Sequence, residues 1–196
     1  MGFTTTVLTQ MFLQVLGFVF SFLAGLFVLR FVMQWARAPF RNPIGQFVMA
    51  LTDWAVLRAR RFVPGWRGLD LSTLLLAWTV ETVSVLVALF MLNAPATSSG
   101  EVLFLAFAAG FLEVLRTAAY VIVGATLVFV VLSWINPHAP IAPLAEAIAS
   151  PFLRPFQRRI PTIGGIDLSP LILLLALQLL LGVLASVKYG LLRLPM

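Results

Sequence analysis

The fold is decided by a short motif that the chain carries twice, as DLSTLLL at residues 70–76 and as DLSPLIL at residues 167–173. The similarity extends upstream, because residues 43–76 as a whole reappear 97 positions later as residues 140–173. In both copies a basic, amphipathic stretch leads through a Pro/Gly turn and an Asp into a long apolar run. Internal repeats of this kind indicate that each copy is one structural unit. We therefore predict two tandem units and expect any function to lie where the copies meet.

The composition excludes an ordinary soluble domain. Of the 196 residues, 61% are hydrophobic and 10% are charged, whereas soluble domains carry roughly 25% charged residues. A bilayer supplies the apolar surroundings that such a chain needs, so we predict an integral membrane protein. The chain contains no cysteine, which excludes disulfides and thiolate metal sites on it. Its formal net charge of +6 does not belong to a soluble basic domain, so we expect no direct nucleic-acid partner.

Four long apolar stretches predict an all-α membrane protein with four transmembrane helices. Each stretch is long enough, at about 1.5 Å per residue, to cross ~30 Å of hydrocarbon. They cover residues 12–35, 71–92, 111–135 and 168–189. We assign residues 1–92 to the first repeat, residues 93–110 to a linker and residues 111–196 to the second repeat. Residues 100–109 are apolar and form either a short interfacial helix or an extension of the third span.

Arginines are concentrated in the loops that join the two spans of each repeat. Six lie between spans one and two and three lie between spans three and four, whereas the loop between spans two and three has none. Excess Lys and Arg marks the cytoplasmic side of a membrane protein. We therefore predict that both basic loops face the cytoplasm and that both termini face the periplasm, although Lys188 and Arg193 near the carboxyl end oppose this. The two repeats then have the same orientation and are parallel.

Residues 44–63 predict an amphipathic helix that lies in the headgroup region. Apolar residues recur there at three- and four-residue spacing around Trp54, and arginines crowd the carboxyl end. The Trp ring enters the lipid boundary while guanidinium groups meet lipid phosphates. In the second copy Ser150-Pro151 is typical of an N-cap followed by a first-turn proline, so we expect two short helices there. The arginines of the two segments are Arg58, Arg60, Arg61, Arg154, Arg158 and Arg159.

An aspartate follows each Pro/Gly turn and opens a span. As N-caps, Asp70 and Asp167 would satisfy free backbone N–H groups and meet the positive end of the helix. Each is also close enough in sequence to the arginine pair of its own copy to close the turn as an ion pair. The turn residues are Pro64 and Gly68 in the first copy and Pro161 and Gly165 in the second. The glycines give the backbone freedom that these turns need.

Glu81 lies in the middle of the second span, where an acid must be neutral, paired or in contact with a wet cavity. Its counterpart in the second copy is Gln178, and this pair lies where the copies would approach. Arg30 and Arg116 are candidate partners of Glu81, and Glu113 can also pair with Arg116 at i,i+3 spacing. Glu81 therefore either joins helices or serves as a proton or ion site.

Small residues recur at about every fourth position of two spans and predict close helix packing. The stripe of span one is Gly17, Ser21 and Gly25, and that of span four is Gln178, Gly182, Ser186 and Gly190. The stripes predict either a contact between spans one and four or a homo-oligomer formed through one of them.

The sequence contains no residue pattern typical of an enzyme. It lacks a Ser/His/Asp arrangement, paired carboxylates, a glycine-rich phosphate loop and zinc-ligand spacing, and the single histidine, His138, has no second ligand near it in sequence. We therefore expect no enzymatic activity, no cofactor and no bound metal.

The chain resembles the YggT/YlmG family of small bacterial membrane proteins. In the first copy the resemblance rests on RFVMQW at residues 30–35, Asn42-Pro43, and Arg60-Arg61 with Pro64 and Asp70. In the second copy it rests on Ser133-Trp134, SPFLRP at residues 150–155, RRIP at residues 158–161 and GGIDLSP at residues 164–170. The resemblance implies a bacterial inner-membrane protein. Plastid and cyanobacterial members are associated with haem attachment to cytochrome b6 and with nucleoid organisation, and bacterial members with cell shape, division-gene neighbourhoods and osmotic or potassium homeostasis. It supplies no catalytic residues.

These features together predict a non-enzymatic inner-membrane scaffold or assembly factor. Its basic interfacial helices would contact membrane lipids through their headgroups and also a membrane-protein partner. The arginines either hold the loops on the cytoplasmic side or bind an anionic partner. The alternative is a small channel or ion-transport accessory in osmotic or potassium homeostasis, with Glu81 and Gln178 at the helix interface. Four spans are few for a pore, so this alternative needs an oligomer.

Overall fold

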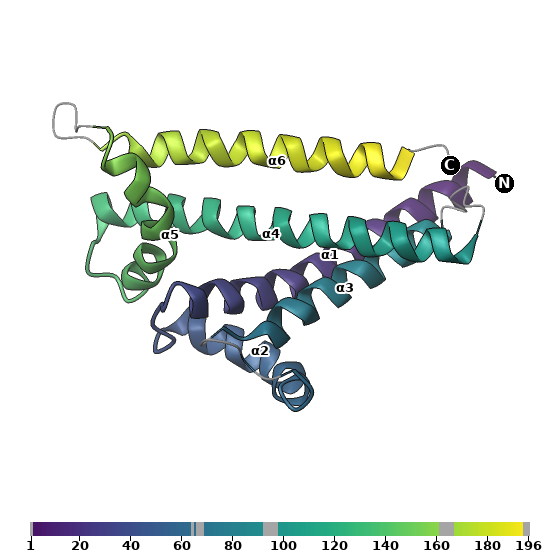
Figure 1. Cartoon of the computed structure of the whole chain (residues 1–196), viewed down its shortest axis with the longest axis horizontal. Helices are drawn as coiled ribbons and strands as arrows, with labels where there is room; N and C mark the ends of the chain where they lie inside the picture. Colours follow the sequence, from purple (N-terminus) through teal and green to yellow (C-terminus); the bar gives the residue numbers. More distant parts are fainter. Residues whose placement is uncertain (1, 64, 66–68, 92–97, 161–166, 194–196) are drawn as a thin grey trace.

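The computed structural model of the chain describes residues 2–63, 65, 69–91, 98–160 and 167–193. These residues are organised as six helices, which confirms the prediction of an all-α protein (Figure 1). The helices are α1 (Gly2–Trp35), α2 (Pro43–Ala59), α3 (Leu71–Met91), α4 (Ser99–Ile135), α5 (Ala142–Gln157) and α6 (Ser169–Arg193). Two long helices flank a short one in each half of the chain.

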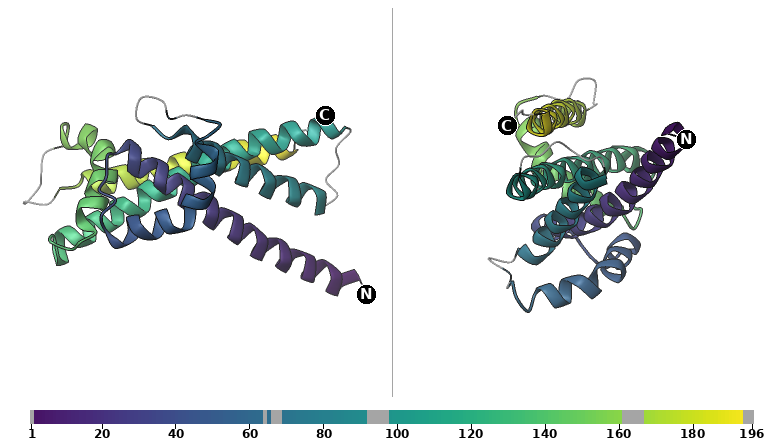
Figure 2. Two further views of the ribbon diagram at one scale, coloured as in Figure 1. Left: turned by 90° about the horizontal axis from the view of Figure 1, so that it is seen from below. Right: turned by 90° about the vertical axis from the view of Figure 1, so that its right-hand side faces the viewer.

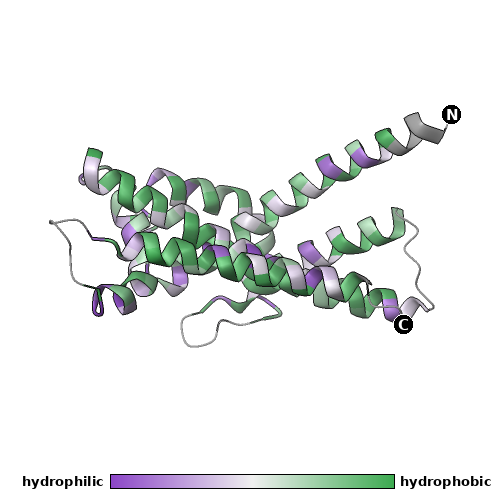
Figure 3. Cartoon of the chain, turned by 90° about the horizontal axis from the view of Figure 1, so that it is seen from above, coloured by the Kyte–Doolittle hydropathy of each residue, from purple (hydrophilic) through white to green (hydrophobic). Residues whose placement is uncertain are grey.

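Four of the helices are long and apolar enough to cross a membrane, as predicted. Their apolar stretches are Val7–Trp35, Leu71–Met91, Ser99–Ile135 and Ser169–Leu192. Figure 3 shows hydrophobic residues along most of their length. α4 is a single helix of 37 residues, so residues 100–109 extend the third span and do not form a separate helix. It begins at the N-cap Ser98, whose Oγ accepts a hydrogen bond from the Glu101 backbone N–H at 3.3 Å.

α4 is the central helix of the bundle. It contacts α1, α3, α5 and α6, whereas α1 packs mainly on α3. Figure 1 shows α6 on one side of α4 and α3 on the other, and Figure 2 shows that the amino-terminal part of α1 diverges from its neighbours. Within the described residues α1 and α6 do not contact each other, so the first alternative predicted from the small-residue stripes, a contact between spans one and four, is wrong, and the homo-oligomer stays a prediction. The reason for the missing contact is that α4 lies between them. Gly182 and Gly190 of α6 accordingly make no close contact, since a Cβ at either position would meet no atom within 4 Å.

The buried side chains form an apolar core around the carboxyl half of α1. Phe27 and Met33 are its largest fully buried members, and they pack with residues of α2, α3, α4 and α5. A second buried cluster, which includes Leu153, Leu173 and Leu177, joins α5 and α6 to α4. Lipid tails are as apolar as these side chains, so the spans are held together by the closeness of their packing and by polar contacts.

α3 and α4 approach each other closely at Gly110 of α4. A Cβ at this position would lie 2.6 Å from Thr82 Oγ1 and 2.8 Å from the Thr82 backbone nitrogen. Such distances are too short for any side chain, so the two helices keep this separation only because residue 110 is a glycine. Thr82 and its neighbour Glu81 are both buried at this crossing.

α5 is one continuous helix, which corrects the prediction of two short helices in this segment. Pro151 and Pro155 lie inside it, although an internal proline removes a backbone hydrogen bond and costs about 3 kcal/mol. Leu144 and Ile148 before Pro151 are buried in the core around α1, and Leu153 after it is buried in the cluster with α6. Tertiary packing on both sides of the proline therefore outweighs the local signal for a helix end.

Candidate lipid-binding and partner-binding site

Most arginines of the described residues lie at one end of the bundle, which we call the basic end. It consists of α2, α5 and the helix ends that they join (Figure 1). Its arginines, all exposed, are Arg37, Arg41, Arg58, Arg60, Arg61, Arg154, Arg158 and Arg159. The residues predicted to bind lipids or a partner are therefore gathered in one region.

α2 turns large apolar side chains away from the bundle. We call Phe47, Leu51, Trp54 and Leu57 the α2 outer face; they recur at three- and four-residue spacing and are between 37% and 57% exposed. Arg58 and Arg61 follow at its carboxyl end and are also exposed. The opposite side of the helix, which includes Val48, Thr52 and Val56, is fully buried. The exposed side of α2 is thus apolar and basic.

Arg30 of α1 forms an ion pair and a hydrogen bond with α2. Arg30 is only 5% exposed, and its Nη1 donates to Thr52 Oγ1 at 2.6 Å and to Asp53 Oδ1 at 2.7 Å. Thr52 Oγ1 donates in turn to the Val48 carbonyl oxygen at 2.6 Å. Arg30 therefore pairs with Asp53 and not with Glu81. Asp53 was not among the predicted partners, although a lone acidic residue in a basic amphipathic segment was a signal for it.

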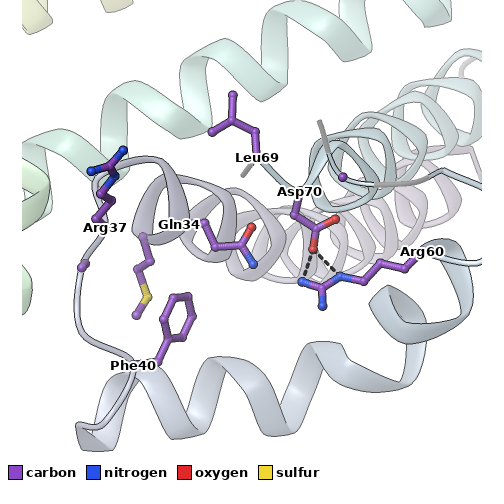
Figure 4. A pocket seen from close by; sticks show the side chains of 9 residues that line it. Gln34, Arg37, Phe40, Arg60, Leu69 and Asp70 are labelled. Carbon is purple, nitrogen blue, oxygen red and sulfur yellow. Dashed lines mark hydrogen bonds and ion pairs between the residues drawn. The ribbon is translucent and has the colours of Figure 1, made fainter. Parts of the chain in front are cut away.

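Asp70, just before α3, pairs with Arg60 at the end of α2, as Figure 4 shows. Arg60 Nε and Nη2 both donate to Asp70 Oδ2, at 2.8 and 2.5 Å, and Ser72 Oγ donates to Oδ1. Burial by itself would raise the pKa of Asp70. The hydrogen bonds from Arg60 and Ser72, the charge of Arg60 and a hydrogen bond from Gln34 outweigh burial and lower the pKa below its ordinary value of 3.8. Asp70 also fixes the first turn of α3, because its carbonyl oxygen accepts from Thr73 Oγ1 at 2.6 Å.

Asp167, ahead of α6, is bonded by a side-chain amide, whereas Asp70 is bonded by an arginine. Asp167 Oδ1 accepts from the Ser169 backbone N–H at 2.8 Å, and Oδ2 accepts from Gln157 Nε2 at 2.9 Å. Gln157 is the residue 97 positions after Arg60. Within the described residues the arginine pair that follows Gln157 does not bond to Asp167, so the ionic closure expected in this copy does not form. Burial would raise the pKa of Asp167, but the hydrogen bonds from Ser169 and Gln157 lower it overall.

α5 presents charge outward, in contrast to the α2 outer face. Its large aliphatic residues are buried, whereas Arg154 within it and Arg158 and Arg159 just after it are exposed. Phe152 packs against Trp35 at the end of α1, with ring centroids 5.4 Å apart. This contact joins the two halves of the chain at the basic end. The apolar α2 outer face and the exposed arginines of α5 therefore belong to the same region.

A separate group of charged side chains lies within the membrane-spanning part of the bundle. Glu81 is 3% exposed, and its Oε1 has no hydrogen-bond partner among the described residues. Glu113 accepts from Arg116 Nη1 at 3.3 Å and from Lys188 Nζ of α6. The charges of Glu113, Lys188 and Arg116 all act on Glu81. Lys188 was missed as a partner because its place near the carboxyl end suggested a flanking charge, although it lies inside the last apolar stretch.

Gln178 does not belong to this group, contrary to the expectation that it meets Glu81. It lies on the exposed side of α6. Within the described chain the backbones of α3 and α6 do not contact each other, because both pack on α4. The two residues therefore do not face each other.

Some predicted positions cannot be placed in this region. Pro64, Gly68, Pro161 and Gly165 lie outside the described residues. His138 is exposed, and its backbone N–H donates to Asn136 Oδ1 at 3.2 Å. No group of three His, Cys, Asp or Glu side chains within the described part of the chain could hold a metal ion.

Comparison with known proteins finds relatives that match most of the chain. A family model described as CCB3/YggT matches residues 9–92 and 108–187, one segment in each half. The uncharacterized protein YggT of Escherichia coli K12 is 33% identical over 154 residues, which are 78% of each chain. An uncharacterized protein of Pseudomonas aeruginosa is 33% identical over 170 residues, which cover 86% of this chain and 83% of the relative. No solved structure is significantly similar to the chain.

Proposed function

The chain belongs to the CCB3/YggT family, and we propose that it is a non-enzymatic membrane scaffold or assembly factor. In this proposal each half of the chain is one of two parallel units in a bacterial inner membrane. The basic end faces the cytoplasm and both termini face the periplasm, which the concentration of arginines at one end supports. The basic end attaches to lipid headgroups through α2 and to a membrane-protein partner through α5.

The α2 outer face is the observation that carries this proposal. A helix on the surface of a water-soluble protein turns its polar side outward, whereas α2 turns aromatic and aliphatic residues outward. An apolar face with arginines at its edge is the arrangement that enters the headgroup boundary by about 5–10 Å. Trp54 would then lie among the glycerol groups while Arg58 and Arg61 reach lipid phosphates. This arrangement has no role in a helix that contacts only water.

The exposed arginines after Leu153 support the partner-binding part of the proposal. Arg154, Arg158 and Arg159 form no ion pair with the described residues of the chain, so their charge is available to an acidic partner or to anionic lipid. Each such residue near an anionic membrane surface contributes about 1 kcal/mol. α5 lacks an exposed apolar face, so its surface fits a polar and acidic protein segment better than the acyl region.

The first test measures the depth of Trp54 in the bilayer. A variant that keeps Trp54 and replaces the other four tryptophans with phenylalanine is placed in vesicles that contain brominated lipids. We expect Trp54 fluorescence to be quenched most by bromine near the glycerol groups. A matched variant that keeps only Trp78, inside α3, should be quenched most by bromine deeper in the acyl chains. A Trp54 that no brominated lipid quenches would contradict the attachment of α2 to the membrane.

The second test asks whether the arginines of α5 bind the partner. Photo-crosslinking in native membranes is compared between the wild-type chain and a variant with Arg154, Arg158 and Arg159 replaced by Glu. We expect the partner crosslinks to disappear while membrane insertion persists. The control is Glu146→Lys, a charge reversal at an exposed position of the same helix. Crosslinks that survive the arginine reversal would exclude this surface as the binding site.

The arrangement gives no comparable support to a channel or ion-transport accessory. Gln178 is exposed on α6 and does not face Glu81. Glu113 is paired with two cations, Arg116 and Lys188. The ion pair between Glu113 of α4 and Lys188 of α6 is an interhelical contact of the kind that charged residues commonly make inside spans.

A further inference from the structure

A cavity of about 590 Å³ opens at the basic end, between the carboxyl end of α1, the end of α2, and Gly65, Leu69 and Asp70 ahead of α3. Its lining includes the apolar side chains Met33 and Phe40 and the polar side chains Gln34, Arg37 and Arg60. Cavities of roughly 300–1,000 Å³ with apolar walls and a few polar groups are typical of small-molecule sites. The cavity lies where α1 ends and α3 begins, which is the depth of the lipid headgroups in the proposed orientation.

Two polar side chains at this cavity have unused bonding capacity. Gln34 Oε1 is shielded from solvent and has no hydrogen-bond partner among the described residues. A shielded acceptor without a donor is unfavourable, so a hydroxyl or amine that reaches this oxygen would be stabilised. Arg60 uses two of its N–H groups on Asp70, and its other donors have no partner among the described residues. In Figure 4 Gln34 lies between Arg37 on one side and the Asp70–Arg60 pair on the other.

Arg37 occupies a backbone position that favours glycine. Its φ is +53°, in the left-handed region that side chains with a Cβ avoid. The Ala38 N–H donates to the Met33 carbonyl oxygen at 2.8 Å and the Arg37 N–H to the Gln34 carbonyl oxygen at 3.1 Å. This is the Schellman helix end, in which glycine is the preferred residue. The turn therefore does not need an arginine, and the Arg37 side chain lines the cavity without a partner among the described residues.

We propose that this cavity binds a phosphate ester that also carries a hydroxyl group, supplied by the glycerol-phosphate headgroup of an anionic phospholipid. The inference rests on the proposed attachment of the basic end to lipid. The Arg37 guanidinium takes the phosphate, because its planar fork matches two phosphate oxygens. Gln34 Oε1 accepts a hydrogen bond from the hydroxyl group of the headgroup. The charge of Asp70 is neutralised by Arg60 and so does not repel the phosphate.

Native mass spectrometry of the full chain in detergent, with equal amounts of phosphatidylglycerol and phosphatidylcholine, tests this site. We expect the wild-type chain to retain phosphatidylglycerol in preference to phosphatidylcholine. Arg37→Gly should weaken this binding about tenfold, the effect of losing one charge-assisted contact, and should keep its thermal stability because glycine suits the turn. The matched pair is Arg37→Gln and Arg41→Gln, since Arg41 is exposed in the same connection but does not line the cavity. Arg41→Gln should bind as the wild-type chain does.

A second arm distinguishes the lipid from a free phosphate ester. Glycerol phosphate is titrated by calorimetry into nanodiscs that contain only phosphatidylcholine. Saturable binding that Arg37→Gln abolishes, without a preference for phosphatidylglycerol, would support the site with a soluble ligand. Equal losses in Arg37→Gln and Arg41→Gln, or no binding in either arm, would overturn the site. Such results would leave the proposed function intact, which the quenching of Trp54 tests separately.

Discussion

At the scale of single residues, the two members of the Arg30–Asp53 ion pair differ in how deeply they are buried. The side chain of Arg30 is 5% exposed and that of Asp53 is 44% exposed. Water can solvate the carboxylate if the arginine is removed, whereas removing the carboxylate leaves a buried guanidinium with the Thr52 hydroxyl. Breaking a buried pair by removing one partner is costly mainly because of the charge that remains. Removing Arg30 alone and removing Asp53 alone should therefore change the stability of the protein by different amounts.

We expect Asp53→Ala to lower the free energy of unfolding by on the order of 2 kcal/mol, a value reduced for the exposure of Asp53. Arg30→Met combined with Asp53→Ala should be more stable than Asp53→Ala alone, because no buried charge remains. Thermal unfolding in detergent, followed by circular dichroism, measures both differences. A double variant no more stable than Asp53→Ala would show that the unpaired charge is not the cause.

Asp70 gives the stability of the protein a dependence on acid pH. Its folded pKa is lowered from the ordinary value of 3.8, so the carboxylate form is favoured by folding. The resulting stabilisation is fully present above pH 3.8 and is lost as the pH falls through the folded pKa. Asp70→Asn should therefore unfold at a lower temperature than the wild-type chain at pH 7, and the two midpoints should converge at acid pH. A constant difference across the titration would exclude this ion pair as the cause.

At the scale of helices, the contact between α3 and α4 depends on one glycine. We expect Gly110→Ala to lower the free energy of unfolding by about 1–3 kcal/mol, because the new methyl group overpacks the contact with Thr82. The control is Gly124→Ala in the same helix, where a Cβ meets no atom within 4 Å. That variant should be neutral or slightly more stable, since alanine favours helix. Equal effects in thermal unfolding would mean that helix propensity, and not packing, sets the response at both positions.

The two short helices show how far an element can be predicted from its residues. Residues 44–63 are predicted as helical from the three- and four-residue spacing of their apolar residues, and α2 covers Pro43–Ala59 with Asn42 as its N-cap. The polar contact of α2 with α1 joins Arg30 to Thr52, which is 22 residues later, and no spacing rule reveals such a contact. In α5 the local signal at Pro151 was misleading, because burial on both sides of the proline is a tertiary effect.

At the scale of the whole molecule, hydropathy predicted the spans but not their packing. The second and fourth predicted spans agree with the apolar stretches Leu71–Met91 and Ser169–Leu192 to within a few residues, since the need for about 20 apolar residues is a local property. The central place of α4 and the pairing of Glu113 with Lys188, 75 residues away, depend on which helix faces share contacts. A single sequence does not contain that information, so Gln178 was expected at an interface and lies on the exposed side.

The length of α4 has a consequence for the surrounding lipid. Its 37 residues extend about 55 Å, whereas α3 has only 21 residues and extends about 32 Å. A bilayer cannot match both lengths at once, so α4 has to tilt or the membrane has to thicken on one flank of the protein. Such hydrophobic mismatch is relieved when neighbours with equally tall spans gather there. The protein thus favours neighbouring membrane proteins by the length of their spans as well as by their charge.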